Sequence, residues 1–417
     1  MRRFLPVIAL LLLAASCTGS GSGATTTSTQ PPIPPQTTTT AATPTTGAVT
    51  VVEPVSGSLT LWAPADVAPS LAAGIDAFSA ATGVDVTVVE HTLDETIAAV
   101  RGGEIPDVFY GYHAWIVELA SGGVLEPLFL EDTTDILGPA LDAFTLRGSL
   151  YGVPLAVRSG AMLRNTAMVA APVESTIGFG TACLAVDEGQ PCILVPTSAG
   201  EIFLPFLAAG GGYLFGYDDT TGYDRADHGL TVDGAATGFS EVEALIGGGR
   251  LVHALEGAPF NAFLEGRAAF LLVGPDEIEP AIEALAGTGI GFAIDPLPMV
   301  GDNVSPPLLD GFGLFVNAHG DDKVPASLLV REYLAAPTVA AIQGDGGAML
   351  AVAANGRRRP QIVEADLAFE ALSQAVDLLF DGTTAEQALG EAARTLRALL
   401  EEPEDESGGE DEEGDGG

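Results

Sequence analysis

Length and charge set the first limits on what this chain can be. It has 417 residues, 47% of them hydrophobic, which is enough apolar material for two lobes and argues against disorder throughout. It carries 56 acidic and 16 basic residues, a net charge of -40, and such a surface does not suit nucleic acids or anionic lipid headgroups as partners.

The N-terminal segment predicts export from the cell. Residues 1–17 have a basic start, an apolar run too short to span a bilayer, and small residues before Cys17. The ending Ala14-Ala15-Ser16-Cys17 resembles a bacterial lipobox, whose cysteine is lipidated, although leucine is usual where Ala14 stands. This lipoprotein signal peptide implies a protein anchored by lipid on the extracytoplasmic face of the cell membrane. A cleaved secretory signal with an incidental cysteine is the alternative.

Two further segments contain few apolar residues that could be buried in a core. Residues 18–56 are rich in Gly, Ser, Thr and Pro and are predicted to form a disordered linker next to the anchor. Residues 403–417 are strongly acidic and are predicted to form a disordered, solvated tail.

Strand and helix patterns alternate after Gly57. The predicted strands cover 58–63, 84–91 and 106–110, and the predicted helices cover 69–83, 92–103 and 114–123. Ser70 is expected to cap the first helix, and Thr92 with Glu95 is expected to form a capping box on the second. Repeated strand–helix–strand units predict an α/β fold with parallel sheets, in which ligands bind at the carboxyl ends of strands.

The stretch PDVFYGYHAW, residues 106–115, gathers four aromatic side chains and a histidine. Phe109 is predicted to pack in the sheet. Tyr112, His113 and Trp115 follow the predicted strand, so they are expected to face a cleft, with packing in the core as the alternative.

The remaining cysteines, Cys183 and Cys192, are close in sequence and flank a loop-like stretch. Outside the cytoplasm they are expected to form a disulfide, because a metal site would need further ligands nearby. The histidines show no metal-ligand spacing and the glycine-rich stretches match no nucleotide loop, so neither a metal nor a cofactor is predicted. The basic run at 357–359 is predicted to be a solvated loop.

Several segments, in this order, resemble the extracellular solute-binding proteins of carbohydrate ABC transporters of the maltose-binding type. They are LTLWAPAD, FSAATGVDVTVVEH, RGGEIPDVFYGYHAWIVELASGGVLEPL, LYGVPLAVRSGAMLRN, LPFLAAGGGYLFGYDD, FNAFLEGRAAFLLVGP, IGFAIDPLP, LLDGFGLFVNAHG and GTTAEQALGEAARTL. The resemblance runs from about Leu59 to Leu400. It implies a two-lobed periplasmic-binding-protein-like fold (type II), each lobe a mainly parallel sheet flanked by helices, with the ligand cleft between lobes. Lobe I is expected at 57–157 and 308–356, and lobe II at 158–307 and 357–402.

A sugar is bound by hydrogen-bonding groups at its edge and aromatic rings on its faces. The positions that the chain places at or near the family's ligand contacts are Asp66, Gly111, Tyr112, His113, Trp115, Arg158, Glu201, Asp276 and Phe369. Asp66 matches a sugar-binding aspartate, whereas Gly111 stands at a stacking tryptophan and Arg158 replaces a glutamate. For the aromatic residues the alternative is packing. Arg158 could instead be a surface charge at the hinge or pair with a nearby acid, or it could bind a negative group on the solute.

More of the family's aromatic positions are changed. Glu201 falls near a tyrosine that stacks on sugar, and Asp276 and Phe369 each fall at a tryptophan. Maltose itself is therefore a doubtful ligand, even though the architecture matches.

The resemblance implies a monomeric, membrane-anchored solute-binding component of an ABC importer, which captures a carbohydrate by closing its lobes and delivers it to permease subunits. No catalytic residue is predicted. The alternatives are a binding lipoprotein for a non-sugar or anionic solute, a sensor, and a secreted enzyme that acts on glycans.

Overall fold

The structure of the chain is a computed structural model that describes residues 57–186, 191–196, 199–253, 258–320, 322–336, 339–340 and 346–401. The predicted signal peptide with Cys17, the linker 18–56 and the tail 403–417 lie outside the described residues. None of the helices in the described ranges is both long and apolar enough to cross a membrane.

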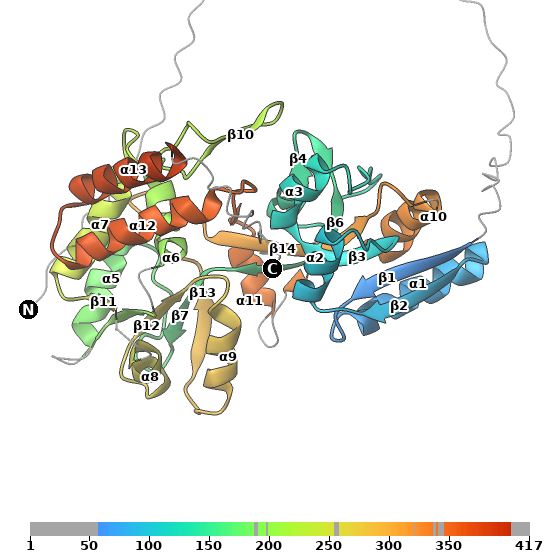
Figure 1. The fold of residues 1–417 in the computed structure, drawn as a ribbon. Coiled ribbons are helices and arrows are strands. Elements are labelled where there is room, and N and C mark those ends of the chain that lie inside the picture. The colour runs from blue at the N-terminus through green and yellow to red at the C-terminus, as the bar shows by residue number, and fades with distance from the viewer. Residues whose placement is uncertain are drawn as a thin grey trace, which may run out of the picture. The chain divides into compact units, whose positions relative to one another are not determined.

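One sheet contains seven strands (Figure 1). They are β1 (Ser58–Ala63), β2 (Asp85–Glu90), β3 (Val108–Tyr112), β6 (Gly152–Ser159), β14 (Leu308–Val316), β15 (Val339–Ala340) and β16 (Arg357–Arg358). Along the main path the order is β15-β6-β14-β3-β1-β2, and β16 pairs with β14. Strand β14 runs antiparallel to both β6 and β3, whereas β1 is parallel to β2 and β3.

Helices cover both faces of this sheet. They are α1 (Ala68–Thr82), α2 (Leu93–Arg101), η1 (His113–Trp115), α3 (Ile116–Ser121), α4 (Gly138–Ala143), α10 (Lys323–Leu328) and the π-helix η3 (Leu329–Leu334). Leu59 and Leu61 of β1 point to one face and pack with Leu71 and Phe78 of α1. Phe109 is 0% exposed in the core on the other face, where it was predicted to pack. The alternation of side chains along each strand thus builds two cores from one sheet.

Of the two helix-capping predictions, one is confirmed and the other is wrong. The capping box of α2 is confirmed: the Thr92 N–H donates to Glu95 Oε2 at 2.9 Å, and the Glu95 N–H donates to Thr92 Oγ1 at 3.2 Å. The cap predicted at Ser70 is wrong, because α1 begins at Ala68 and the Ser70 hydroxyl donates to the carbonyl of Val67 at 2.7 Å. A proline in the first helical turn needs no N–H partner, so the helix starts earlier than the serine indicated.

A second sheet contains five strands in the order β11-β8-β12-β7-β13. They are β7 (Ala161–Asn165), β8 (Ile193–Val195), β11 (Leu251–His253), β12 (Phe270–Val273) and β13 (Phe292–Asp295). Strand β8 is parallel to β11 and β12, whereas β7 is antiparallel to β12 and β13. Gly160 alone separates β6 of the first sheet from β7 of the second, so the chain passes between the sheets almost as one strand.

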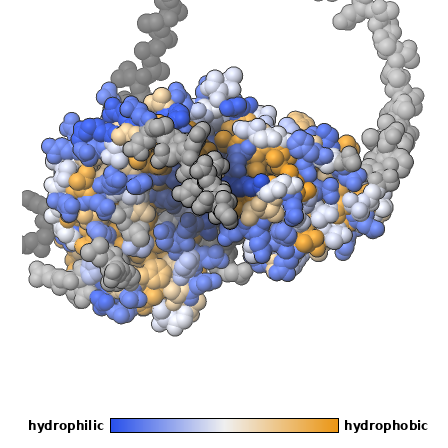
Figure 2. Space-filling view, in the orientation of Figure 1, coloured by the Kyte–Doolittle hydropathy of each residue, from blue (hydrophilic) through white to orange (hydrophobic). Residues whose placement is uncertain are grey.

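The second sheet also has its own helices and core. The helices are α5 (Thr176–Ala182), η2 (Cys183–Ala185), α6 (Gly200–Ala209), α7 (Ala235–Gly247), α8 (Ala258–Leu264), α9 (Ile278–Ala286), α12 (Ala365–Phe380) and α13 (Ala385–Glu401). Helix α11 (Gly346–Ala353) packs against β6 and β15 of the first sheet and also contacts β13 of the second. Helices α12 and α13 lie side by side and pack with α6 and α7 (Figure 1). Two short hairpins complete the fold, β4 (Thr145–Leu146) with β5 (Ser149–Leu150), and β9 (Gly216–Asp218) with β10 (Gly222–Asp224). Hydrophilic residues cover much of the face visible in Figure 2, with apolar residues scattered between them.

Cys183 and Cys192 are joined in a disulfide, and both residues are buried in the core of the second sheet. Replacing both with alanine is expected to lower the free energy of unfolding by about 3 kcal/mol, because the unfolded chain loses a short closed loop. Urea denaturation of the wild-type and doubly substituted proteins measures the difference. Reduction of the wild-type protein should produce a similar loss, and unchanged stability after reduction would contradict the prediction.

Candidate ligand-binding site

The aromatic stretch 106–115 is arranged differently from the prediction. Strand β3 begins at Val108, because the carboxylate of Asp107 accepts the N–H of Thr60 at 2.8 Å just before the strand. It continues to Tyr112, since Gly111 and Tyr112 pair with β14. The prediction that these two residues lie in a loop is therefore wrong, and the pairing with the distant β14 is the reason.

Four of the nine predicted contact residues do not line the pocket that the other five share. Asp66 lies exposed in the turn after β1. Phe369 is 6% exposed, and the guanidinium carbon of Arg359 lies 4.9 Å from the centre of its ring. Gly111 is buried under the ring of Trp115, so closely that a Cβ on residue 111 would lie 2.5 Å from a ring carbon. Phe369 is thus a packing residue in this structure, and Gly111 makes room for an aromatic ring from elsewhere.

His113 is the fourth of these residues and does not face the pocket. Its side chain is 0% exposed, and its Nδ1 accepts the N–H of Gly311 at 3.1 Å. Burial lowers the pKa of His113 to about 4, so the ring is neutral at physiological pH. Its carbonyl also accepts a hydrogen bond from Gln361 at 3.0 Å, which fixes the turn between β3 and α3.

The other five predicted residues line one pocket of about 640 Å³. They are Tyr112, Trp115, Arg158, Glu201 and Asp276. Two further residues of this pocket, Asp310 and Arg359, were not predicted. Six of these seven, all except Trp115, form a hydrogen-bonded and ion-paired group that we call the polar floor.

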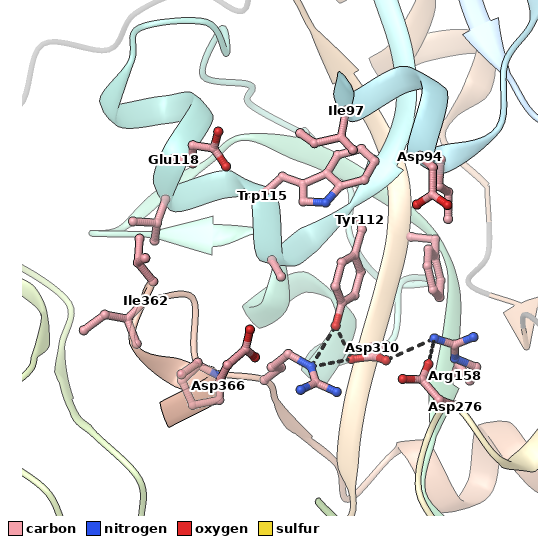
Figure 3. Close-up of a pocket in the computed structure, with 18 of the residues that line it drawn as sticks. Asp94, Ile97, Tyr112, Trp115, Glu118, Arg158, Asp276, Asp310, Ile362 and Asp366 are labelled. Atoms are coloured by element: carbon pink, nitrogen blue, oxygen red, sulfur yellow. Dashed lines mark hydrogen bonds and ion pairs between the residues drawn. The ribbon is translucent and has the colours of Figure 1, made fainter. Parts of the chain in front are cut away.

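Asp310 is the centre of the polar floor (Figure 3). Its side chain is 1% exposed, and its Oδ1 accepts the hydroxyl of Tyr112 at 2.5 Å. The guanidinium groups of Arg158 and Arg359 each donate to this carboxylate at 3.3 Å. Burial alone would raise the pKa of Asp310, but the charge of Arg359 and the other partners hold it below its usual range. The carboxylate is therefore ionised and positions all three neighbours.

The same two arginines reach carboxylates carried by other elements. Arg158, on β6, also pairs with Asp276, which follows β12 of the second sheet. Arg359, just after β16, donates from Nη1 to Glu201 of α6 at 2.5 Å and from Nε to the Tyr112 hydroxyl at 2.9 Å. Burial raises the pKa of Tyr112, so its hydroxyl stays protonated and donates to Asp310. The polar floor therefore connects elements of both sheets through charged hydrogen bonds.

The prediction of a solvated loop at 357–359 is wrong for two of its arginines. The guanidinium of Arg358 stacks over the ring of Tyr217, 4.2 Å from its centre, and donates to the carbonyl of Thr145 at 2.7 Å. Arg359 belongs to the polar floor. The sequence did hold a signal for Asp310, because a carboxylate inside the apolar stretch LLDGFGLFV is rarely buried without a partner.

The opposite side of the pocket is mostly apolar. One wall comes from α2, η1 and α3, and the other comes from the segment between β16 and α12. We call this part the apolar rim; it consists of Leu93, Ile97, Trp115, Val117, Pro360, Ile362 and Val363. Asp94, Asp366 and the Arg101–Glu118 ion pair stand among these side chains. Among the described residues, no group of histidine, cysteine or carboxylate side chains is arranged to hold a metal ion.

Two α/β lobes, joined by strands that pass between them and sharing a pocket lined from both sheets, define a solute-binding protein. Residues 73–368 match the family model of the bacterial extracellular solute-binding proteins, and the chain belongs to this family. Two structures have the same fold. The extracellular solute-binding protein of Staphylococcus aureus in complex with maltose has a TM-score of 0.71 and 18% identity, over 82% of this chain and 97% of that one. A cyclo/maltodextrin-binding protein complexed with maltotetraose has a TM-score of 0.68 and 21% identity, with the same coverage.

Two curated relatives are similar in sequence. The maltotriose-binding protein of Pyrococcus abyssi is 28% identical over 212 residues, 48% of this chain and 44% of that protein. The galactooligosaccharide-binding protein of Bacillus subtilis is 24% identical over 267 residues, 59% of this chain and 62% of that protein. The chain thus matches less than two thirds of the length of either relative. The expected family and the expected two-lobed fold are confirmed.

Proposed function

We propose that this protein is the extracellular, lipid-anchored solute-binding component of an ABC importer, and that it captures a carbohydrate by lobe closure and passes it to permease subunits. The polar floor carries the proposal, because it offers guanidinium donors and carboxylate acceptors from elements of both sheets. Sugar hydroxyls both donate and accept hydrogen bonds, so one ligand can use both kinds of group. The maltotriose- and galactooligosaccharide-binding relatives, and the solved structures with maltose and maltotetraose, support a sugar as the ligand.

The lobes of this proposal follow the sheets. Lobe I takes 57–157 and 308–356, and lobe II takes 158–307 and 357–402. All strands of the second sheet lie within the first part of lobe II, and the first sheet draws its strands mainly from lobe I. A ligand that contacts both lobes stabilises the closed state, because its contacts with both exist only there. The anchor at Cys17 rests on the N-terminal sequence pattern alone.

A neutral sugar fits the pocket better than an anionic one. The lining contains six carboxylates against three guanidiniums. Arg158, which suggested an anionic solute, already pairs with Asp276 and Asp310. An added anion would have to compete with these carboxylates in an acidic pocket. We therefore infer that a neutral sugar binds more tightly than the uronic acid of the same ring.

Trp115 gives the sharpest test of the site. Calorimetric titration of the full mature protein with maltose, maltotriose and galactooligosaccharides is expected to identify at least one ligand. Replacing Trp115 with alanine should weaken its binding at least about tenfold, or about 1.4 kcal/mol, because a stacking surface is lost.

The chain provides a matched control for this test. Trp62, the other tryptophan, stacks on His91 with ring centres 4.0 Å apart and does not line the pocket. Trp62→Ala should leave affinity within about twofold of the wild-type value. If the Trp115 variant binds every sugar that the wild-type protein binds with unchanged affinity, the site is refuted. The absence of binding to any carbohydrate would refute the function.

A further inference from the structure

The two ends of the pocket have different chemistry (Figure 3). Arg158, Asp276 and Asp310 of the polar floor lie together at one side of the view, joined by hydrogen bonds and ion pairs. Trp115 with Ile97, and Ile362 across from them, lie away from this group. A ligand that fills the pocket therefore meets the polar floor at one end, and at the other it meets hydrocarbon side chains with Asp94, Asp366 and the Arg101–Glu118 pair among them.

The apolar rim contains hydrophobic side chains whose exposure does not contribute to the stability of the fold. Val363 is 79% exposed and lines the pocket. Ile362 lies against the core of the second sheet and also reaches the pocket. An exposed valine is ordinary by itself, but this one lines the same pocket as Trp115 and Ile97. Together these residues form two hydrocarbon walls that face the same space.

A sugar ring alone does not account for both walls. Sugars place their weakly positive CH faces on aromatic rings, and Trp115 is the aromatic member of the apolar rim. The opposite wall is aliphatic. Valine, isoleucine and proline side chains offer no donor or acceptor to ring hydroxyls, so a hydroxyl placed against them would lose its hydrogen bonds to water. The space between the walls thus suits a group without hydroxyls.

We propose that the solute is a glycoside whose sugar contacts the polar floor and whose neutral, apolar aglycone, aromatic or short alkyl, lies between Trp115 and Val363. The inference deepens the proposed function and rests on it. Asp94 and Asp366 stand beside the aglycone and disfavour a negative charge on it. A volume of about 640 Å³ is within the range of pockets that enclose a ligand of this size.

Matched pairs of glycosides test the aglycone separately from the sugar. Calorimetric titration of the full mature protein uses the methyl and phenyl glycosides of glucose, galactose and maltose. For the sugar that binds, the phenyl glycoside is expected to bind at least about tenfold more tightly than the methyl glycoside, because the ring leaves water for the apolar rim. Val363→Ser should reduce this ratio at least threefold.

The control is Val324→Ser, a change at a valine that is 68% exposed on α10 and does not line the pocket. Its phenyl-to-methyl ratio should equal that of the wild type. Equal affinities for the methyl and phenyl glycosides would contradict the proposed aglycone site, and so would an unchanged phenyl-to-methyl ratio in Val363→Ser. Neither result would contradict sugar binding. If no glycoside and no free sugar binds, the proposed function itself fails and the aglycone fails with it.

Discussion

Replacing Asp310 with alanine is expected to lower the free energy of unfolding by about 3–5 kcal/mol. The carboxylate is 1% exposed and is the common acceptor for Tyr112, Arg158 and Arg359. Its removal leaves the buried Tyr112 hydroxyl without its acceptor and takes the buried counter-charge from Arg158 and Arg359, which keep only Asp276 and Glu201. Urea denaturation at pH 7, monitored by circular dichroism, measures the loss of stability.

Asp276 provides the matched control, because it pairs with the same Arg158 but its side chain is 63% exposed. Solvent screens such a pair, so Asp276→Ala should cost less than about 1 kcal/mol. If the two substitutions cost the same, burial of the Asp310 carboxylate is not what makes it important. A cost below about 1 kcal/mol for Asp310→Ala would show that the arginines do not depend on it.

Acidification from pH 6.5 to 4 is expected to remove about 3 kcal/mol of stability through His113 alone. The pKa of this buried ring is lowered to about 4, while an unfolded histidine titrates near its ordinary value of about 6.5. Between these values the unfolded state binds a proton that the folded state does not. The contribution of the neutral ring is therefore fully present above pH 6.5, and it declines by about 1.4 kcal/mol per pH unit until pH 4.

His113→Asn isolates this contribution from the other titrating groups. The asparagine oxygen can accept the Gly311 N–H as Nδ1 does, but the side chain has no proton to gain. Unfolding free energies of both proteins at several pH values should give slopes that differ by about one proton between pH 4 and 6.5. Parallel curves for wild type and His113→Asn would contradict the prediction.

Local patterns predicted much of the fold. The capping box at Thr92 depends on neighbours close in sequence, and it appears in the structure. Phe109 is buried as predicted, although its partner Phe315 is remote in sequence. The end of β3 was wrong because Gly111 and Tyr112 pair with a strand that arrives much later in the chain. A pattern read along one segment contains no information on such a partner.

The candidate site shows the same limit. Arg359 looked like a solvated residue because its partners, Glu201 and Asp310, are remote in sequence. Of the nine positions named from the family resemblance, five line the pocket and four do not. The ring of Trp115 covers Gly111 so closely that residue 111 has no room for a side chain. Such a contact becomes visible only when the packing is known.

The path of the chain between the two sheets also determines which sheet can be completed first during synthesis. All five strands of the second sheet lie between Ala161 and Asp295, so they are available together once that stretch has been made. In the first sheet, β3 and β6 are both early, yet they do not pair with each other; β14 lies between them and pairs with both. The first sheet, whose strands begin earliest in the chain, therefore lacks its central strand β14 until synthesis has reached Val316.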